Sequence, residues 1–225
     1  TVLSRGLGDV YKRQVGVWDA EHAAEIDRHF PDVLAYLNGL EPPIYPGPID
    51  SQMRSEGEAI FNAQCSRCHG TYGDVETYPN LLVPLDEVGT DPALARSYID
   101  EPEFLQWLQD SWFAQGEHPA VFEGELGYIA PPLDGIWATA PYFHNGSVPN
   151  LAAVLDSSIR PAKWTRNFGS SELDFERMGW PYTETEEGFR TYNTALSGYG
   201  NQGHTFGDGL TETQRQAVLE YLKSL

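Results

Sequence analysis

Both cysteines of the chain lie in one short motif, Cys65-Ser66-Arg67-Cys68-His69. A C-x-x-C pair can form a redox dithiol, but that use is typical of a βαβ setting, and here a helical pattern precedes the motif. A structural zinc site would need further Cys or His ligands at short spacing, which are missing. The histidine directly after the second cysteine favours haem, because two thiols on one turn form thioethers to the vinyl groups and the imidazole binds the iron. The motif therefore predicts one covalently attached haem c.

A haem iron has a sixth position that is either filled or open, and this choice decides function. His204 stands out as a candidate because its loop, GNQGHTFG, holds glycines that let the backbone approach a flat ring. Met178 is the alternative sulfur ligand, and it would raise the reduction potential relative to two histidines. For every candidate an ordinary surface or core role remains the alternative. The other candidates are His144, Met53 and His118.

The stretch 130–155, APPLDGIWATAPYFHNGSVPNLAAVL, places His144 on a tight polar turn beside aromatic residues. His144 either caps this turn or lies at the haem edge, and the residues alone leave both open. Trp137 beside the turn is the aromatic residue that most merits a test for electron transfer, although packing explains it as well. Candidate partners for the haem propionates, which the sequence does not rank, are Arg67, Arg96, Arg160 and Arg166.

Two amphipathic patterns should position the motif. A helix is predicted from residue 51 to the cysteines, and a second in the last segment. Gly57 and Phe61 share one face of the first helix, where a glycine permits close approach of another helix. We therefore expect this face to cross Tyr221 and Leu222 of the last helix.

Capping residues predict where these helices begin. Ser51 is the expected cap of the first helix, and Thr211 with Gln214 forms a possible capping box for the last. Further helices are predicted over 103–115 and 150–157, and the stretch 169–209 shows no clear period. Scarce period-2 runs argue against a β-sandwich. The chain is expected to divide into three parts. Residues 1–14 form a non-native leader that resembles adaptor-derived translated sequence. Residues 15–48 hold connecting helices, with a helical pattern over 19–40, and a Pro-rich linker, and residues 49–225 form the cytochrome c domain.

The composition limits the classes of fold and of binding partner that the chain can have. The 225 residues include 33 acidic and 14 basic side chains, a net charge of −19, which excludes recognition of nucleic acid or of an anionic membrane through phosphate charge. No run approaches the roughly 20 apolar residues of a membrane span. The 22 glycines and 16 prolines indicate many ordered loops. We therefore predict a mainly α-helical cytochrome c domain with long Gly/Pro-rich loops around the haem.

Several separated motifs carry a resemblance that covers residues 36–225. They are CSRCHG, TYPNLLVPLDEVGTD, APPLDGIWATAPYFHNGSVPNL, GNQGHTFG and the final EYLKSL. Together they resemble the C-terminal half of the di-haem cytochrome c peroxidase superfamily, and within it the branch that contains the bacterial rubber oxygenase. This set is far more specific than the haem motif alone.

The resemblance implies roles for particular residues. Cys65 and Cys68 would bind the second haem of such a protein, His69 would be its proximal ligand, His204 its distal ligand, and His144 would lie at the haem edge. The peroxidases place a methionine on the helix after the PYFHNG turn, but residues 151–177 contain none, so that ligand does not carry over. The carbonyls of Thr139 and Pro141 match positions that hold calcium in the peroxidases.

The resemblance also implies a larger context. Members have two haem domains and act in the periplasm or outside the cell, whereas this sequence has one haem motif, so we expect a truncated protein whose reactive domain preceded residue 15. The partner would then be that missing domain or a redox protein. The first hypothesis is electron relay through a bis-His haem. The second is a catalytic haem with His144 handling protons, and the third a non-haem dithiol or metal-binding module.

Overall fold

The computed structural model describes residues 22, 25, 26, 28–100, 102–110, 114, 121 and 123–225. These residues fall into two compact units. The smaller holds the described residues up to 41 and those from 102 to 123, and the larger holds 42–100 and 124–225. The leader 1–14 and His118 lie outside the described residues, and the boundaries predicted after residues 14 and 48 stay predictions.

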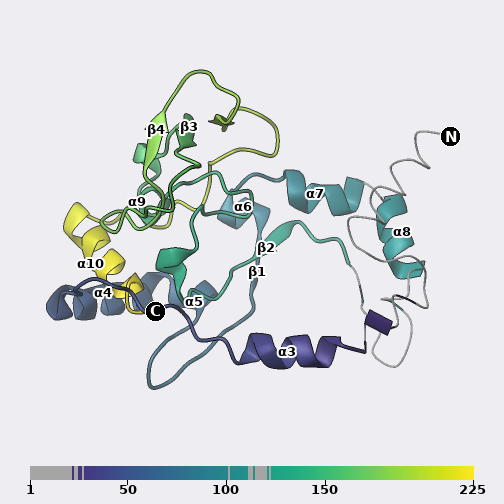
Figure 1. The fold of residues 1–225 in the computed structure, drawn as a ribbon, viewed down its shortest axis with the longest axis horizontal. Helices are drawn as coiled ribbons and strands as arrows, with labels where there is room; N and C mark the ends of the chain where they lie inside the picture. The colour runs from purple at the N-terminus through teal and green to yellow at the C-terminus, as the bar shows by residue number, and fades with distance from the viewer. Residues whose placement is uncertain are drawn as a thin grey trace. The chain divides into compact units, whose positions relative to one another are not determined.

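The larger unit carries most of the regular structure (Figure 1). Its elements are α4 (Ser51–Gln64), α5 (Ser66–His69), β1 (Leu82–Pro84), α6 (Leu85–Val88), α7 (Ala93–Asp100), β2 (Gly127–Ile129), the 3₁₀ turn η2 (Ile136–Ala138), α9 (Leu151–Leu155), the 3₁₀ turn η3 (Ser157–Ile159), β3 (Lys163–Arg166), β4 (Tyr182–Glu184), β5 (Tyr192–Asn193) and α10 (Glu212–Leu222).

The predicted mainly α-helical class was wrong, because the fold is mixed. Strands β1 and β2 form an antiparallel pair, with Val83 opposite Tyr128. Strands β4, β3 and β5 form a second antiparallel sheet, with Trp164 opposite both Glu184 and Tyr192. Each of these strands has two to four residues, too few for an alternating pattern to stand out from the Gly- and Pro-rich sequence around it.

Helices α4 and α10 cross at the predicted faces, which confirms that expectation (Figure 1). A Cβ at Gly57 would lie 1.9 Å from the carbonyl oxygen of Ala217, so only glycine permits this approach. The rings of Phe61 and Tyr221 lie 5.2 Å apart, and both residues are buried. The crossing fixes the end of α4, where the haem motif begins.

The helix ends agree only in part with the sequence patterns. Asp50, rather than Ser51, caps α4, because its carboxylate accepts hydrogen bonds from the backbone N–H groups of residues 52 and 53. The capping box of Thr211 and Gln214 is confirmed at the start of α10. The helix predicted over 150–157 is shorter: Asn150 caps α9, which ends at Leu155 before η3.

The described part of the smaller unit contains α3 (Phe30–Asn38) and α8 (Pro102–Asp110). Helix α3 lies within the predicted 19–40 pattern and has Pro31 in its first turn, where the missing N–H of proline breaks no helical hydrogen bond. Helix α8 covers the first part of the predicted helix 103–115, and residues 111–113 and 115 lie outside the described residues.

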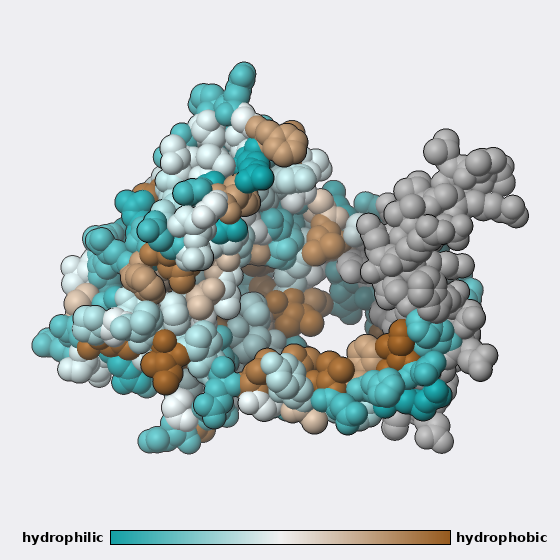
Figure 2. All heavy atoms as spheres, in the orientation of Figure 1, coloured by the Kyte–Doolittle hydropathy of each residue, from teal (hydrophilic) through white to brown (hydrophobic). Residues whose placement is uncertain are grey.

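In the described residues, every helix is too short or too polar to cross a membrane. Figure 2 shows a largely hydrophilic face over β3 and β4, with separate hydrophobic patches near α4 and α10.

Candidate functional site

The larger unit contains an open cavity of about 630 Å³, within the range of roughly 300–1,000 Å³ typical of cofactor sites. The haem motif and both candidate histidines of the loops open onto it: Cys65, Cys68, His69, His144 and His204 are all lining residues. Most of the remaining wall is apolar. It includes Phe61, Val83, Val88, Ile129, Leu133, Phe143, Leu151, Leu155, Phe206, Val218 and Leu222.

The end of α4 brings both thiols and one imidazole to the same wall. The N–H of Cys65 still donates to the carbonyl of Phe61, and the N–H groups of Cys68 and His69 donate to the carbonyl of Cys65. This extra turn is α5. Both cysteines are free, and burial, with a smaller effect of Cys68, raises the pKa of the Cys65 thiol to about 11. Cys65 is therefore a neutral thiol at neutral pH.

A hydrogen bond orients the imidazole ring of His69. Its Nδ1 lies 2.9 Å from the carbonyl oxygen of Pro131, which can only accept, so Nδ1 carries the proton and Nε2 keeps its lone pair. Burial lowers the pKa of His69, although the Pro131 hydrogen bond opposes this shift. A neutral imidazole with one nitrogen tethered to a carbonyl is the usual state of a metal-ligating histidine. Pro131 could not be identified as its partner from the sequence.

His204 faces the same cavity from the loop before α10. Its backbone is left-handed (φ +45°) and its N–H donates to the carbonyl of Val88 at 2.6 Å. The preceding Gly203 has φ +77°, and a Cβ there would lie 2.1 Å from the carbonyl carbon of Gly89. Burial, then the nearby His69, lowers the pKa of His204 to about 4, so its imidazole is neutral.

The two imidazoles are spaced as one iron between them would require. Their ring centroids lie 6.2 Å apart. A ring nitrogen lies about 1.1 Å from its centroid and a metal–imidazole bond is about 2.0–2.1 Å, so two rings on opposite sides of one metal have centroids about 6.3 Å apart. In addition, Nδ1 of His204 is buried without a hydrogen-bond partner in the described structure. The thiols, the imidazoles and the apolar wall thus fit a haem.

His144 lies at another part of the wall. Its ring stacks on Tyr128 with centroids 4.0 Å apart, and the Tyr128 hydroxyl donates to the carbonyl of Asp91 at 2.6 Å. Burial lowers the pKa of His144, while Asp91 opposes the shift. Sequence reasoning missed Thr90, whose buried hydroxyl lines the cavity and has no hydrogen-bond partner among the described residues. A single threonine in a Gly-Thr-Asp turn gives no signal by which it could have been found.

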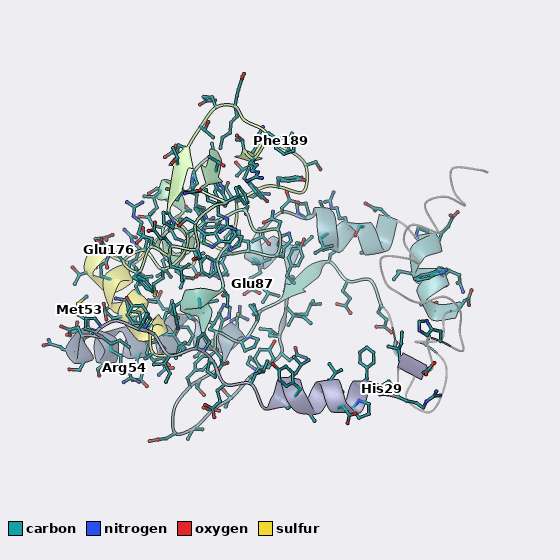
Figure 3. All side chains as sticks on the ribbon, in the orientation of Figure 1. His29, Met53, Arg54, Glu87, Glu176 and Phe189 are labelled. Atoms are coloured by element: carbon teal, nitrogen blue, oxygen red, sulfur yellow. The ribbon has the colours of Figure 1, made fainter. Side chains whose placement is uncertain are left out.

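The sulfur candidates do not line this cavity. Met178 is buried in the hydrophobic core and is absent from the lining residues. Met53 lies in the first turn of α4 (Figure 3), and the twelve residues to Cys65 correspond to about 18 Å of helix. Trp137 is also outside the lining, and its indole N–H donates to the carbonyl of Pro43 at 2.8 Å.

The four candidate arginines have different surroundings. Arg67 lines the cavity and pairs with Glu87, which Figure 3 labels near the centre of the larger unit. Arg160 donates only to backbone carbonyls. Arg166 lies over the ring of Trp180, with 3.6 Å from the guanidinium carbon to the centroid. Arg96 is exposed.

Calcium at Thr139 and Pro141 stays a prediction. Both residues line the cavity. Among the described residues, no group of three or more His, Cys, Asp or Glu side chains could hold a metal ion. An ion at Thr139 and Pro141 would therefore depend on carbonyl oxygens and water.

Comparison with known proteins supports the cytochrome interpretation. The family model described as RoxA-like, cytochrome c-like matches residues 127–165, from β2 to β3, a stretch that contains Pro131, His144 and Arg160. The uncharacterized protein y4iJ of Sinorhizobium fredii (strain NBRC 101917 / NGR234) is 32% identical over 252 residues, covering 84% of this chain and 42% of that protein.

The uncharacterized protein y4iM of the same strain is 28% identical over 203 residues, covering 76% of this chain and 45% of that protein. The chain thus spans less than half the length of these two curated relatives. The family match supports a haem-binding, cytochrome c-like domain related to RoxA.

Proposed function

We propose that the chain is a c-type cytochrome domain that transfers single electrons through one covalently bound haem. One observation carries the proposal: two thiols line the same largely apolar cavity as the imidazoles of His69 and His204, whose centroids lie 6.2 Å apart. Cys65 and Cys68 would form the thioethers, His69 would be the proximal ligand and His204 the distal ligand. When bound, haem supplies a one-electron iron couple.

The residues of the chain account for the other requirements of an electron relay. The Pro131 carbonyl accepts a hydrogen bond from the His69 ring, which would keep this ligand in one orientation in both iron oxidation states. The largely apolar wall would reduce contact of the haem with water. If His69 and His204 both held the iron, oxygen or peroxide would find no free position on it, which favours relay over catalysis at this haem.

The wider context is part of the same proposal. Because the chain spans less than half of the two relatives, we propose that it is the electron-relay half of a larger di-haem peroxidase- or oxygenase-like protein that acts in the periplasm or outside the cell. Its electrons would come from, or pass to, another haem domain or a redox protein. A net charge of −19 would favour a basic partner.

A second candidate function has one specific observation in its favour. His144 lines the cavity and stacks on Tyr128, so it is placed to handle a proton if His204 leaves the iron. The dithiol alternative is less supported, because reactive thiols have depressed pKa values and that of Cys65 is raised to about 11.

The test is to produce the full chain together with a cytochrome c maturation system. We expect a red protein that keeps its haem after extraction with acidified acetone, whereas Cys65→Ala/Cys68→Ala loses it. The wild type should cycle between ferric and ferrous forms and react slowly with peroxide. A colourless protein would support the dithiol module, and a ferric haem that reacts rapidly with peroxide would support the catalytic alternative.

A further inference from the structure

The guanidinium of Arg160 joins two segments of the larger unit. One is the end of α9, whose last carbonyls have no partner within the helix. The other is the loop that carries His204. All five N–H donors are used: Nε to Ala153 (2.8 Å), Nη2 to Val154 (3.1 Å) and His204 (3.1 Å), and Nη1 to Asn201 (2.8 Å) and Gly203 (2.7 Å), each to the backbone carbonyl oxygen.

The use of all five donors decides whether Arg160 could also bind a haem propionate. A guanidinium has five donors in a fixed fork. Since each already donates to a carbonyl, none is left for a haem propionate without breaking a contact to α9 or to the loop. Arg67, by contrast, lines the cavity itself. Arg160 is therefore assigned to the loop and not to the haem carboxylates.

The loop needs such an anchor because its conformation is unfavourable. His204 has φ +45°, a region that costs a residue with a side chain free energy and persists only where its surroundings impose it. The Nδ1 atom has no hydrogen-bond partner in the described structure, so the ring is not tethered as that of His69 is. The backbone must therefore direct the ring: Val88 accepts from the N–H of His204, and Arg160 donates to its carbonyl.

Phe143 connects the same cation to the imidazole. The guanidinium carbon of Arg160 lies 4.9 Å from the Phe143 ring centroid, and this ring lies 5.9 Å from that of His204. Phe206 packs edge-on at 5.1 Å on the same imidazole. Arg160 thus supports the backbone of His204 directly and one wall of its ring through Phe143.

We propose that Arg160 is a positioning residue that keeps His204 on the haem iron. The inference rests on the proposed function, because it takes His204 as the distal ligand. Without the Arg160 contacts, the loop relaxes from its left-handed conformation, His204 leaves the iron for a larger fraction of the time, and the sixth position becomes open to small ligands.

The test measures ferric spin state and the rate at which carbon monoxide binds the ferrous protein, using the full haem-loaded chain. Arg160→Gln removes the cation and most donors, and Arg160→Lys keeps the charge without the planar fork. The matched control is Arg215→Lys, because Arg215 is also half-buried but donates to Leu210 and pairs with Asp156, outside the contacts of His204.

We expect Arg160→Gln to show a new high-spin fraction and carbon monoxide binding at least about tenfold faster than in the wild type, as loss of more than one charge-assisted hydrogen bond implies. The high-spin fraction and the binding rate of Arg160→Lys should lie between those of Arg160→Gln and the wild type. Both values of Arg215→Lys should match the wild type. Added imidazole should restore the low-spin spectrum of Arg160→Gln, which loss of general stability would not permit.

Two results would overturn the inference. One is a folded Arg160→Gln whose spectrum and binding rate match the wild type. The other is failure of both Arg160 variants to fold while Arg215→Lys folds, since Arg160 would then support the fold and not His204 in particular. A wild type that is already high-spin would instead contradict the proposed bis-His function.

Discussion

Gly203→Ala tests whether the loop that carries His204 can adopt only one backbone conformation. A Cβ at residue 203 would lie 2.1 Å from the carbonyl carbon of Gly89 and 2.3 Å from the nitrogen of Thr90. Both are backbone atoms, so relief requires the loop or the Gly89 turn to move. In the wild type the carbonyl of Gly203 is also held by Arg160.

The expected loss of stability has two parts. A left-handed conformation costs a residue with a Cβ about 1–2 kcal/mol. Overpacking against atoms that yield only with the backbone costs a further ~1–3 kcal/mol. Because the displaced residue precedes His204, we also expect partial loss of the distal ligand and a high-spin component in the ferric spectrum.

Gly198→Ala is a matched control in the same part of the chain. Its φ is +84°, but a Cβ would find its nearest neighbour, the Cβ of Ala93, at an ordinary 3.6 Å. This variant should therefore lose only the conformational part, about 1–2 kcal/mol, and keep the wild-type spectrum. Guanidinium unfolding and ferric absorption spectra measure both effects. Equal stabilities and identical spectra of the two variants would refute the reasoning.

Three further predictions concern the fold around the site. Gly57→Ala should destabilise the protein by about 1–3 kcal/mol in guanidinium unfolding despite its better helix propensity, because the new Cβ meets the Ala217 carbonyl; exposed Ser55→Ala should change little. Trp137→Phe should cost about 1 kcal/mol by the same assay, through loss of the hydrogen bond to Pro43, and a stability equal to the wild type would contradict this. The Ser158 hydroxyl holds the pKa of Asp156 below 3.8, so its contribution to stability is present above that pH and disappears as pH falls through the lowered pKa. Unfolding measured from about pH 5 to about pH 3 should therefore show a smaller loss of stability for Asp156→Asn than for the wild type, and equal slopes would contradict it.

The sequence patterns predicted local features better than long-range ones. The capping box at Thr211 was predictable from a spacing along one helix, and the crossing at Gly57 from the apolar spacing along each of two helices. The strand Lys163–Arg166 was missed, since its partners follow 16 or more residues later and all three strands are short. The mainly α-helical class failed for that reason.

In the candidate site, too, some residues could be predicted from the sequence and others could not. The CxxCH spacing and the glycines beside His204 distinguish these residues by type and position along the chain. Their supports, the Pro131 carbonyl for His69 and the Arg160 guanidinium for the His204 loop, act through backbone atoms far away in sequence. Backbone acceptors are the same for every residue type, so no residue pattern identifies them.

The most direct test of bis-His ligation is the ferric absorption spectrum, extended into the near infrared, of the haem-loaded wild type, His204→Ala and Met178→Leu. The proposal predicts a low-spin wild type without a sulfur-to-iron charge-transfer band, a high-spin His204→Ala that added imidazole returns to low spin, and a Met178→Leu indistinguishable from the wild type. A His204→Ala protein that keeps the wild-type low-spin spectrum would contradict it.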